Sequence, residues 1–275
     1  VRKESDMKKI TSKGCISLIP EIAVKKREKS KKQQLLLTNK RVDWGFKQSV
    51  QAAQLRIEKQ MEQEHKQVLL VSSTLPQEGK SMTAVNLALA FMQHEKKTVL
   101  IDGDLRKPSV AEMLGMEEQK GLAEYLKGNA KVKEVLQKKG DLTVIQGGKV
   151  HGNISSLMDE SRMEELMTFL KSEFDYVIID TPPAYLFSDA AILAGYADRV
   201  LYVVRHDMAE IPQIEKGMES FIQEDKLLGY LINRSQKGFA SYGKYGYGKY
   251  GYGKYGKYQR YVDVKEDDMD TEDSL

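Results

Sequence analysis

The stretch that most constrains how this chain can fold is Ser73-Thr-Leu-Pro-Gln-Glu-Gly-Lys-Ser81. An apolar run at residues 67–71 precedes it, and an amphipathic segment at residues 82–94 follows it. Strand, short loop and helix in this order are the context in which Gly-Lys-Ser forms a phosphate-binding loop. The backbone N–H groups of such a loop point inward, and the helix N-terminus adds a partial positive charge. The sequence therefore predicts a nucleotide phosphate site here.

Individual residues of this loop have distinct expected roles. Lys80 is expected to reach the β- and γ-phosphates of a nucleotide, and the Ser81 hydroxyl is expected to ligate Mg²⁺. One departure from the usual Gly-x-x-x-x-Gly-Lys-Ser pattern is visible, because Thr74 stands where the first glycine usually stands. A Gly-Lys-Ser turn that occurs by chance is the alternative, and two later stretches weigh against it. The residues in and beside the loop that we predict to bind the nucleotide are Thr74, Gln77, Glu78, Gly79, Lys80, Ser81 and Met82.

Further apolar runs follow along the chain, at residues 97–101, 141–145, 176–179, 199–204 and 227–233. They are nearly continuous in Val, Ile and Leu, which is typical of strands buried on both faces of a parallel sheet. Segments with helical patterns alternate with them, at residues 44–64, 82–94, 154–172, 189–195 and 211–224, and residues 109–140 are expected to form short helices. Strands that alternate with helices predict an α/β fold with a doubly wound, mostly parallel sheet, similar to P-loop NTPases.

Acidic residues stand at the ends of two of these strands. Asp102 and Asp104 follow the second strand, and Asp180 ends the fourth. Ligands of open α/β sheets bind at the carboxyl ends of the strands, so these side chains are expected to surround one nucleotide and one metal ion. Phosphoryl transfer depends mainly on positioning, metal ions and stabilisation of charge. We therefore predict ATP and Mg²⁺ as cofactors, with Ser81, Asp102 and Asp180 as metal-binding residues and Lys80, Asp102 and Asp104 as catalytic residues.

Three assignments near this acidic cluster stay open at the level of sequence. Asp102 and Asp104 are both candidates for the general base, which must lie within hydrogen-bond reach of the attacking hydroxyl. Arg106 meets the γ-phosphate, meets an acidic patch, or carries a solvated charge on a loop. Asn233, after the last strand, either binds the edge of a nucleotide base or caps a turn. Arg106 and Asn233 both belong to the predicted nucleotide-binding set. The four histidines match no metal-ligand spacing and are expected to be surface or packing residues.

The N-terminal part of the chain differs from the middle in composition. Residues 1–43 are basic, with the densest run at 24–32. We predict that residues 1–43 form a basic juxtamembrane-type linker, in which the apolar patch at 15–22 is either a short strand or a docking segment. No apolar run approaches the ~20 residues that span a bilayer. Because the first residue is Val, we expect the chain to be an excerpt of a longer protein.

The C-terminal part changes composition again. Residues 241–261 hold eight of the fourteen tyrosines, interleaved with glycine and lysine, so that no buried face can form. The folded P-loop domain is therefore predicted at residues 44–235, and a flexible tyrosine cluster with an acidic end at 236–275. The tyrosines of this cluster are Tyr242, Tyr245, Tyr247, Tyr250, Tyr252, Tyr255, Tyr258 and Tyr261.

Three motifs occur in a fixed order: Ser73–Ser81, Ile101–Pro108 and Val177–Pro183. They resemble the Walker A, Walker A′ and Walker B motifs of the bacterial tyrosine kinases (BY-kinases) of capsule and exopolysaccharide assembly. This resemblance covers residues 44–235 and the tyrosine cluster. It implies an ATP-dependent protein-tyrosine autokinase that phosphorylates its own C-terminal tyrosines. It also implies regulation of the polymerisation and export of capsular or extracellular polysaccharide.

The resemblance further implies partners and a location. These are a homo-oligomer, a transmembrane polysaccharide co-polymerase or activator fused N-terminally, a cognate tyrosine phosphatase, no nucleic acid, and the cytoplasmic face of the bacterial plasma membrane. Residues 16–21 and the basic run after them are similar to the stretch that follows the second transmembrane helix in fused members. Members usually carry Glu-x-x-Arg-x-x-Arg before Walker A for ring assembly. Here only Arg56 of residues 50–56 fits, so a ring is possible but its motif is atypical.

Two other classes of function compete with the kinase. A MinD/ParA-like ATPase switch shares the Walker A and B motifs and usually ends in an amphipathic helix or a DNA-binding surface. The glycine repeats of this C-terminus disfavour such a helix. A non-catalytic scaffold whose tail binds nucleic acid by stacking and charge is disfavoured by the carboxylates at the strand ends. The sequence thus favours the kinase.

Overall fold

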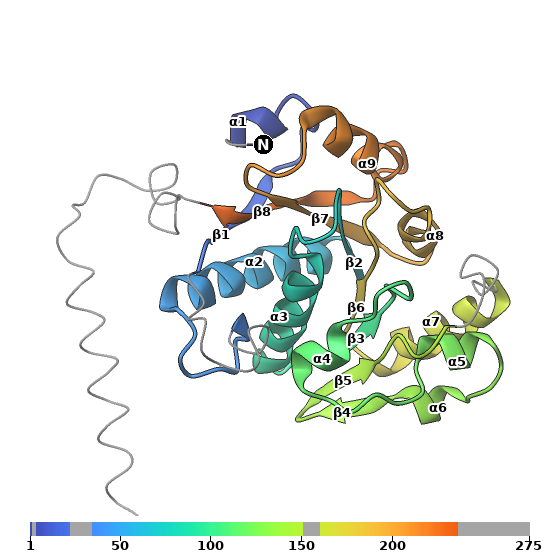
Figure 1. The fold of residues 1–275 in the computed structure, drawn as a ribbon. Helices are drawn as coiled ribbons and strands as arrows, with labels where there is room; N and C mark the ends of the chain where they lie inside the picture. The colour runs from blue at the N-terminus through green and yellow to red at the C-terminus, as the bar shows by residue number, and fades with distance from the viewer. Residues whose placement is uncertain (2–3, 23–34, 151–159, 236–275) are drawn as a thin grey trace, which may run out of the picture. The chain divides into compact units, whose positions relative to one another are not determined.

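The computed structural model describes residue 1 and residues 4–22, 35–150 and 160–235. In this part of the chain, one eight-stranded sheet has the order β1-β8-β7-β2-β6-β3-β5-β4 (Figure 1). Its strands are β1 (Cys15–Pro20), β2 (Val68–Ser73), β3 (Thr98–Asp102), β4 (Gln137–Lys139), β5 (Leu142–Ile145), β6 (Tyr176–Asp180), β7 (Arg199–Arg205) and β8 (Leu227–Ser235). Only β4 pairs antiparallel among the strands described, which confirms the predicted mostly parallel sheet.

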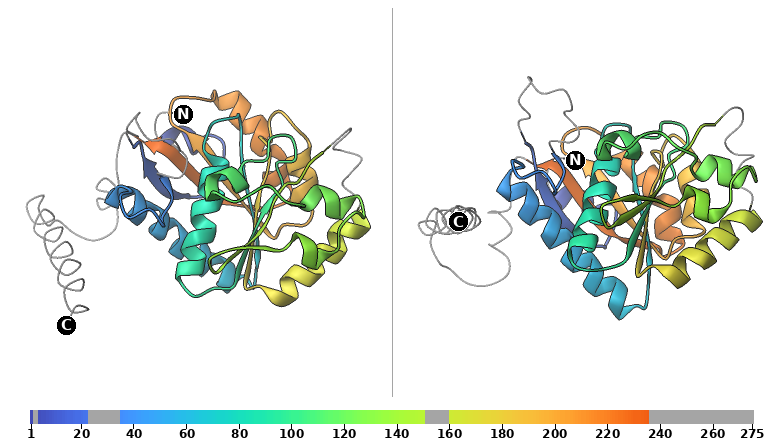
Figure 2. Two further views of the ribbon diagram at one scale, coloured as in Figure 1. Left: turned by 60° about the horizontal axis from the view of Figure 1, so that its bottom comes forward. Right: turned by 90° about the horizontal axis from the view of Figure 1, so that it is seen from below.

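Helices cover both faces of this sheet (Figures 1 and 2). One face packs against α2 (Trp44–Gln63), α3 (Lys80–Gln93) and α4 (Val110–Leu114). The other packs against α5 (Leu122–Leu126), α7 (Glu160–Glu173), α8 (Asp189–Ala194) and α9 (Ile211–Gln223). Two short helices complete the described set, α1 (Glu4–Met7) and α6 (Val132–Val135). This two-sided cover explains why the central strands are apolar at nearly every position.

Alternation along each strand divides the core into two layers. In β2, Val68 and Leu70 belong to the layer under α7 to α9, whereas Leu69 and Val71 belong to the layer under α2 and α3. Successive side chains of a strand point to opposite faces, and β2 is fully buried along its length. The strand that leads into the phosphate-binding loop is thus held from both sides.

The region 109–140 differs in part from the prediction of short helices. It contains α4, α5 and α6, but its last residues form the short strand β4, which pairs with β5 at the sheet edge. The sequence of β4 is Gln-Lys-Lys, and two of its three residues are exposed. It therefore has no apolar run that would predict a strand. The predicted helix at 154–172 matches α7 from residue 160 onward, and residues 151–159 lie outside the described part.

The patch at 15–22 is the short strand of the two alternatives. Strand β1 pairs parallel with β8, and Ile16 and Ile19 are buried in the α2–α3 layer. The Ser17 hydroxyl donates a hydrogen bond to the carbonyl of Ser49 at 2.9 Å. The guanidinium of Arg56, the single match to the assembly motif, donates to the carbonyl of Ile16 at 2.6 Å. Residues from the predicted linker therefore contribute to the folded core.

The far end of β1 lies beside the end of β8. Pro20 is paired with Ser235, and the N–H of Glu21 donates to the carbonyl of Ser235 at 3.2 Å. Because the two strands are parallel, their carboxyl ends lie at the same end of the sheet, and residues 21 and 235 are next to each other there. The basic run at 24–32 and the tail from 236 lie outside the described residues.

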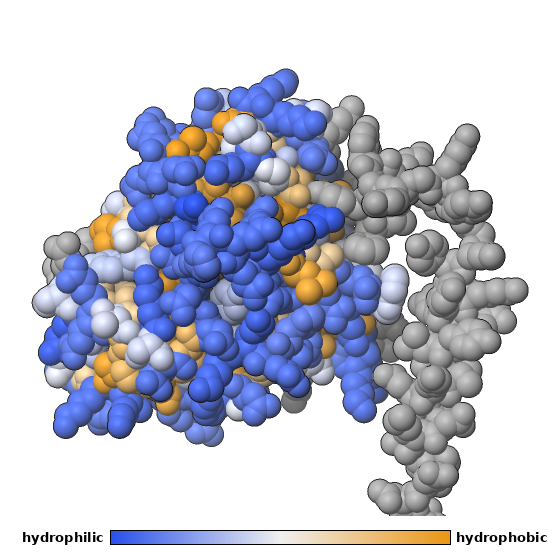
Figure 3. Space-filling view, turned by 180° about the vertical axis from the view of Figure 1, so that it is seen from behind, coloured by the Kyte–Doolittle hydropathy of each residue, from blue (hydrophilic) through white to orange (hydrophobic). Residues whose placement is uncertain are grey.

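The face in Figure 3 is largely hydrophilic, with scattered apolar spots. The large apolar side chains that are exposed are Trp44, Leu55, Tyr185, Leu186, Ile192 and Ile222. None of the described helices combines the length and the hydropathy needed to cross a bilayer.

The packing of β1 generates a stability prediction. We expect Ile19→Ala to lower the free energy of unfolding by about 2–4 kcal/mol, because removal of this core side chain leaves a cavity. Leu55→Ala on α2 is the matched control, since Leu55 is 51% exposed, and should change it by less than about 0.5 kcal/mol. Urea unfolding followed by circular dichroism measures both. Equal, small effects would mean that β1 is not part of the folded core.

Candidate active site

The phosphate-binding loop joins β2 to α3 and ends at Gly79. Gly79 has a φ of 98°, a left-handed conformation that favours glycine. A Cβ atom there would lie 2.0 Å from Nδ2 of Asn233, so any larger residue would displace the Asn233 side chain from the loop. Helix α3 begins at Lys80, the next residue. The loop and the helix N-terminus thus form the strand–loop–helix arrangement that the sequence predicts.

The ammonium group of Lys80 lies among carboxylates. Its Nζ atom is 2.9 Å from Oδ2 of Asp104, 3.8 Å from Oδ1 of Asp180 and 3.0 Å from the Ser81 hydroxyl. Burial acts to lower the pKa of Lys80, but the charges of Asp180 and Asp104 outweigh it and raise the pKa above its ordinary value. Lys80 therefore carries its charge at neutral pH, as a phosphate ligand must.

Asp102 and Asp180 are opposite each other on neighbouring strands, β3 and β6. Oδ2 of Asp102 accepts hydrogen bonds from the N–H groups of Ser109 and Val110, both at 2.9 Å. Its Oδ1 atom and both carboxylate oxygens of Asp180 are buried and have no hydrogen-bond donor among the described residues. Burial raises the pKa of Asp102 to about 7, with a further contribution from the charge of Asp180. Burial also raises the pKa of Asp180 to about 6, against the opposing charge of Lys80.

Buried carboxylate oxygens without donors suit a cation. Among the described residues, no group of three or more His, Cys, Asp and Glu has the spacing of a complete metal site. Mg²⁺ typically takes one or two carboxylates and completes its shell with waters and substrate phosphates. The open oxygens of Asp102 and Asp180, close to the phosphate-binding loop, fit that pattern.

Asp104 and Arg106 are held by neighbours within the chain. Asp104 accepts from Lys80 through Oδ2 and from the N–H of Lys107 through Oδ1, at 3.1 Å. The guanidinium of Arg106 forms two hydrogen bonds with Asp189, at 2.5 and 3.1 Å, and lies 4.2 Å from the centre of the Phe187 ring. Of the three alternatives for Arg106, the described contacts match the acidic partner, because its guanidinium pairs with Asp189. Sequence reasoning missed Asp189, whose only signal is an acidic residue in the first turn of α8.

Several predicted nucleotide ligands serve the loop itself. The Glu78 carboxylate is buried and accepts from the N–H groups of Leu75, at 2.6 Å, and Arg205, at 3.3 Å. Burial raises its pKa, while these backbone bonds act to lower it. Asn233 donates from Nδ2 to the carbonyl of Glu78 at 2.8 Å. The Asn233 side chain therefore stabilises a turn, which is one of its two predicted alternatives.

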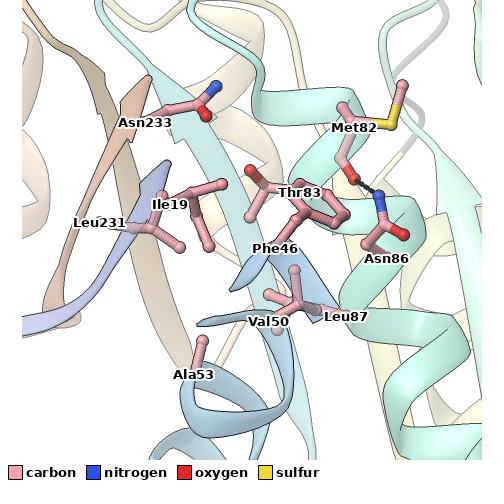
Figure 4. Close-up of a pocket in the computed structure, with 10 residues that line it drawn as sticks. All are labelled: Ile19, Phe46, Val50, Ala53, Met82, Thr83, Asn86, Leu87, Leu231 and Asn233. Atoms are coloured by element: carbon pink, nitrogen blue, oxygen red, sulfur yellow. Dashed lines mark hydrogen bonds between the residues drawn. The ribbon is translucent and has the colours of Figure 1, made fainter. Parts of the chain in front are cut away.

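Thr74, Gln77 and Met82 lie at different parts of the loop region. Thr74 is buried, and its hydroxyl lies 3.2 Å from that of Tyr202. Gln77 is exposed and has a φ of 68°. Met82, with Asn233, lines a mainly apolar cavity between α2, α3, β1 and β8 (Figure 4). Tyr202 and Arg205, both on β7, were missed by sequence reasoning because nothing in an apolar strand indicates which side chain reaches a loop.

Gly103 is a further residue without a sequence signal beyond its place between two aspartates. A Cβ atom there would lie 2.7 Å from the carbonyl oxygen of Asp180 and 2.9 Å from Leu193. The N–H of Gly103 donates to that same carbonyl at 2.8 Å. The absence of a side chain therefore lets the backbone after β3 approach the end of β6 closely, which keeps Asp102 and Asp104 near Asp180.

Comparison with known proteins agrees with this geometry. A ParA family model, described as NUBPL iron-transfer P-loop NTPase, matches residues 64–193. The chain is 35% identical over 183 residues to the tyrosine-protein kinase CpsD of Streptococcus agalactiae, covering 65% of this chain and 80% of that protein. The chain belongs to the bacterial tyrosine kinases. The tyrosine-protein kinase YwqD of Bacillus subtilis is also 35% identical, over 65% of this chain and 77% of its own.

Solved structures place the same fold in kinases and in ATPases. The kinase domain of Escherichia coli tyrosine kinase ETK superposes with a TM-score of 0.75 at 24% identity, covering 92% of this chain and 99% of that one. The cell division ATPase MinD of Pyrococcus furiosus superposes with a TM-score of 0.52, over 62% of this chain and 72% of its own. These structures confirm the predicted fold, and the curated relatives confirm the predicted family and enzyme class, a protein-tyrosine kinase.

The close approach at Gly103 generates a prediction for this tyrosine kinase. Gly103→Ala should lower kcat/KM about tenfold to a hundredfold, because its Cβ forces Asp102 and Asp180 apart and small misplacements of reacting groups are costly. Gly14→Ala is the control, since a Cβ at Gly14 would meet nothing within 4 Å. Steady-state phosphorylation assays, with thermal unfolding to check folding, measure the effect. Full activity in a folded Gly103→Ala protein would show that this close approach does not position the carboxylates.

Proposed function

We propose that this kinase is an autokinase that transfers the γ-phosphoryl group of Mg-ATP to tyrosines of its own C-terminal cluster. The observation that carries the proposal is the buried ammonium of Lys80 beside Asp104 and Asp180, directly after the phosphate-binding loop. One positive charge there faces three buried carboxylates, counting Asp102. Such a site has an excess of negative charge that a divalent cation would balance.

The residues divide the work of phosphoryl transfer among them. Lys80 neutralises charge on the β- and γ-phosphates, and the backbone of the loop and of the start of α3 orients them. Ser81 and Asp180, with Asp102, would hold Mg²⁺. Mg²⁺ held there would supply positive charge that offsets the charge developing on the transferred phosphoryl group.

Two residues remain candidates for the general base, and their surroundings differ. Both oxygens of Asp104 already accept hydrogen bonds, from Lys80 and from the N–H of Lys107. Oδ1 of Asp102 has no donor among the described residues. Each carboxylate oxygen has two lone pairs, so an oxygen that accepts no hydrogen bond leaves the most capacity for the acceptor hydroxyl. Asp102 is therefore favoured over Asp104 as the general base. Its Oδ1 atom can contact either the metal ion or the acceptor hydroxyl, but not both at the same time.

The chain length supports the tail as acceptor. Strand β8 ends at Ser235, three strands from β6 in the sheet order, which is about 14–15 Å at ~4.8 Å per strand. Tyr242, the first tyrosine of the cluster, follows Ser235 by seven residues, a reach of at most about 25 Å. The cluster is therefore long enough to reach the site of its own chain.

The wider setting is also proposed from the family. Regulation of polysaccharide polymerisation and export, a homo-oligomer, a transmembrane activator, a cognate phosphatase and attachment to the inner membrane face all follow from the resemblance. In support, the chain is 29% identical to the tyrosine-protein kinase wzc of Salmonella typhimurium but spans only 32% of it. The alternative, a MinD/ParA-like switch, is disfavoured because the tyrosine kinase domain superposes over more of the chain than MinD does.

Incubation with labelled ATP, followed by mapping of the modified residues, tests this function. We expect label in the cluster between Tyr242 and Tyr261. Lys80→Met should abolish incorporation while leaving the fold intact, because no other charged group in the loop can neutralise the phosphates. Replacement of the eight cluster tyrosines by Phe should abolish incorporation but preserve ATP binding. Incorporation by the Lys80 variant at the rate of the unmodified protein would remove the loop from the mechanism.

A second prediction concerns the metal. Asp180→Asn should lower activity and raise the Mg²⁺ concentration needed for half-maximal activity, because it removes the charge of a buried carboxylate whose oxygens accept no hydrogen bond from the described residues. Asp102→Asn should also lower activity, with a smaller change in Mg²⁺ dependence, since one of its oxygens is occupied by backbone donors. Metal titrations of phosphorylation measure both. An unchanged Mg²⁺ response in the Asp180 variant would exclude it as a metal ligand.

A further inference from the structure

The first residue of the phosphate-binding loop is buried in this protein. Thr74, which replaces the usual glycine, has no exposed surface, and neither does Tyr202 of β7. The Tyr202 hydroxyl donates to Oγ1 of Thr74 at 3.2 Å. Buried hydroxyl groups require hydrogen-bond partners, and in the described part of the chain these two satisfy each other. This contact lies on a residue that sequence reasoning assigned to the nucleotide.

The position of the Tyr202 ring is determined by the core. A Cβ atom on Gly217 of α9 would lie 2.3 Å from the Tyr202 hydroxyl, so the helix leaves room for that oxygen only because residue 217 is glycine. The ring also packs against Phe221, with centroids 6.2 Å apart. Strand β7 is paired with β2 in the register Ser72–Tyr202. Sheet and helix together therefore aim this hydroxyl at the loop.

The same strand contacts the other end of the loop. The backbone N–H of Arg205 donates to the Glu78 carboxylate at 3.3 Å, and its guanidinium donates to the carbonyl of Gln77 at 3.3 Å. Gln77 has a left-handed φ of 68°, which is unfavourable for a residue with a side chain. Contacts from β7 therefore hold the loop where its backbone would not stay by itself. Burial also raises the pKa of Tyr202, so its hydroxyl remains protonated and able to donate.

We propose that Tyr202 is a positioning residue for the nucleotide site, and that its hydrogen bond to Thr74 holds the phosphate-binding loop in its nucleotide-receiving shape. Tyr202 acts through Thr74 and Gly217 makes room for it, so that the three residues form one unit. A loop held in shape before the ligand arrives loses less conformational freedom on binding. The unit is therefore expected to set the affinity for the nucleotide rather than the rate of the chemical step. This inference rests on the proposed binding of ATP.

The test compares Tyr202→Phe, Thr74→Val and the double variant with the unmodified protein. Calorimetric titration with Mg-ADP gives Kd, and phosphorylation assays well below the unfolding temperature give kcat and KM for ATP. We expect each single variant to raise Kd and KM about three- to tenfold, with kcat unchanged. The double variant should be no weaker than the weaker single variant, because both changes remove the same bond.

Two further variants separate positioning from packing. Thr74→Ser keeps the hydroxyl and should have the same Kd as the unmodified protein. Tyr176→Phe removes the hydroxyl of another core tyrosine, at the start of β6 and so at the opposite end of the strands from the loop, and should leave Kd unchanged. An unchanged Kd in Tyr202→Phe, an equal rise in Tyr176→Phe, or effects that multiply in the double variant would each overturn the proposal. No binding of Mg-ADP by the unmodified protein would overturn the proposed function as well.

Discussion

The burial of Lys80 among carboxylates is the interaction on which the rest of the site depends. A buried ammonium is costly unless it is paired, and its partners come from two strands that are far apart in the sequence. Asp104 follows β3, whereas Asp180 ends β6. These strands are neighbours in register, with Asp102 opposite Asp180. The charge cluster is thus a product of the strand order, and a change in that order would leave each charge without its partner.

This cluster also explains why the surroundings are so constrained. Three carboxylates and one ammonium cannot balance one another, so the site is poised for a further positive charge. The chain accommodates the cost by tying one oxygen of Asp102 to the backbone at the start of α4. The close approach at Gly103 keeps the ends of β3 and β6 at hydrogen-bond distance. Small residues and backbone donors, rather than further charged side chains, hold the carboxylates in place.

Much of the site follows from local sequence, because parallel strands direct their carboxyl ends to one edge. That rule brings Lys80, Ser81, Asp102, Asp104 and Asp180 together without knowledge of the packing. It does not give side-chain direction. Glu78 turns into its own loop, and Arg106 pairs with Asp189, because these choices depend on neighbours that are remote in sequence. Strand β1 is equally ambiguous at the level of sequence, since the apolar patch at 15–22 can be a strand only if an edge strand such as β8 is available for pairing.

The parallel pairing of β1 with β8 has a mechanical consequence. Residues 21 and 235 leave the sheet from the same end, next to each other. Tension between the polypeptide that follows Glu21 and the polypeptide that follows Ser235 would pull two parallel strands apart from one end. The hydrogen bonds would then open one after another, as in a zipper, instead of sharing the force as they do under shear. The end of the strand pair that separates first is the end that carries Asn233, whose side chain donates a hydrogen bond to the phosphate-binding loop.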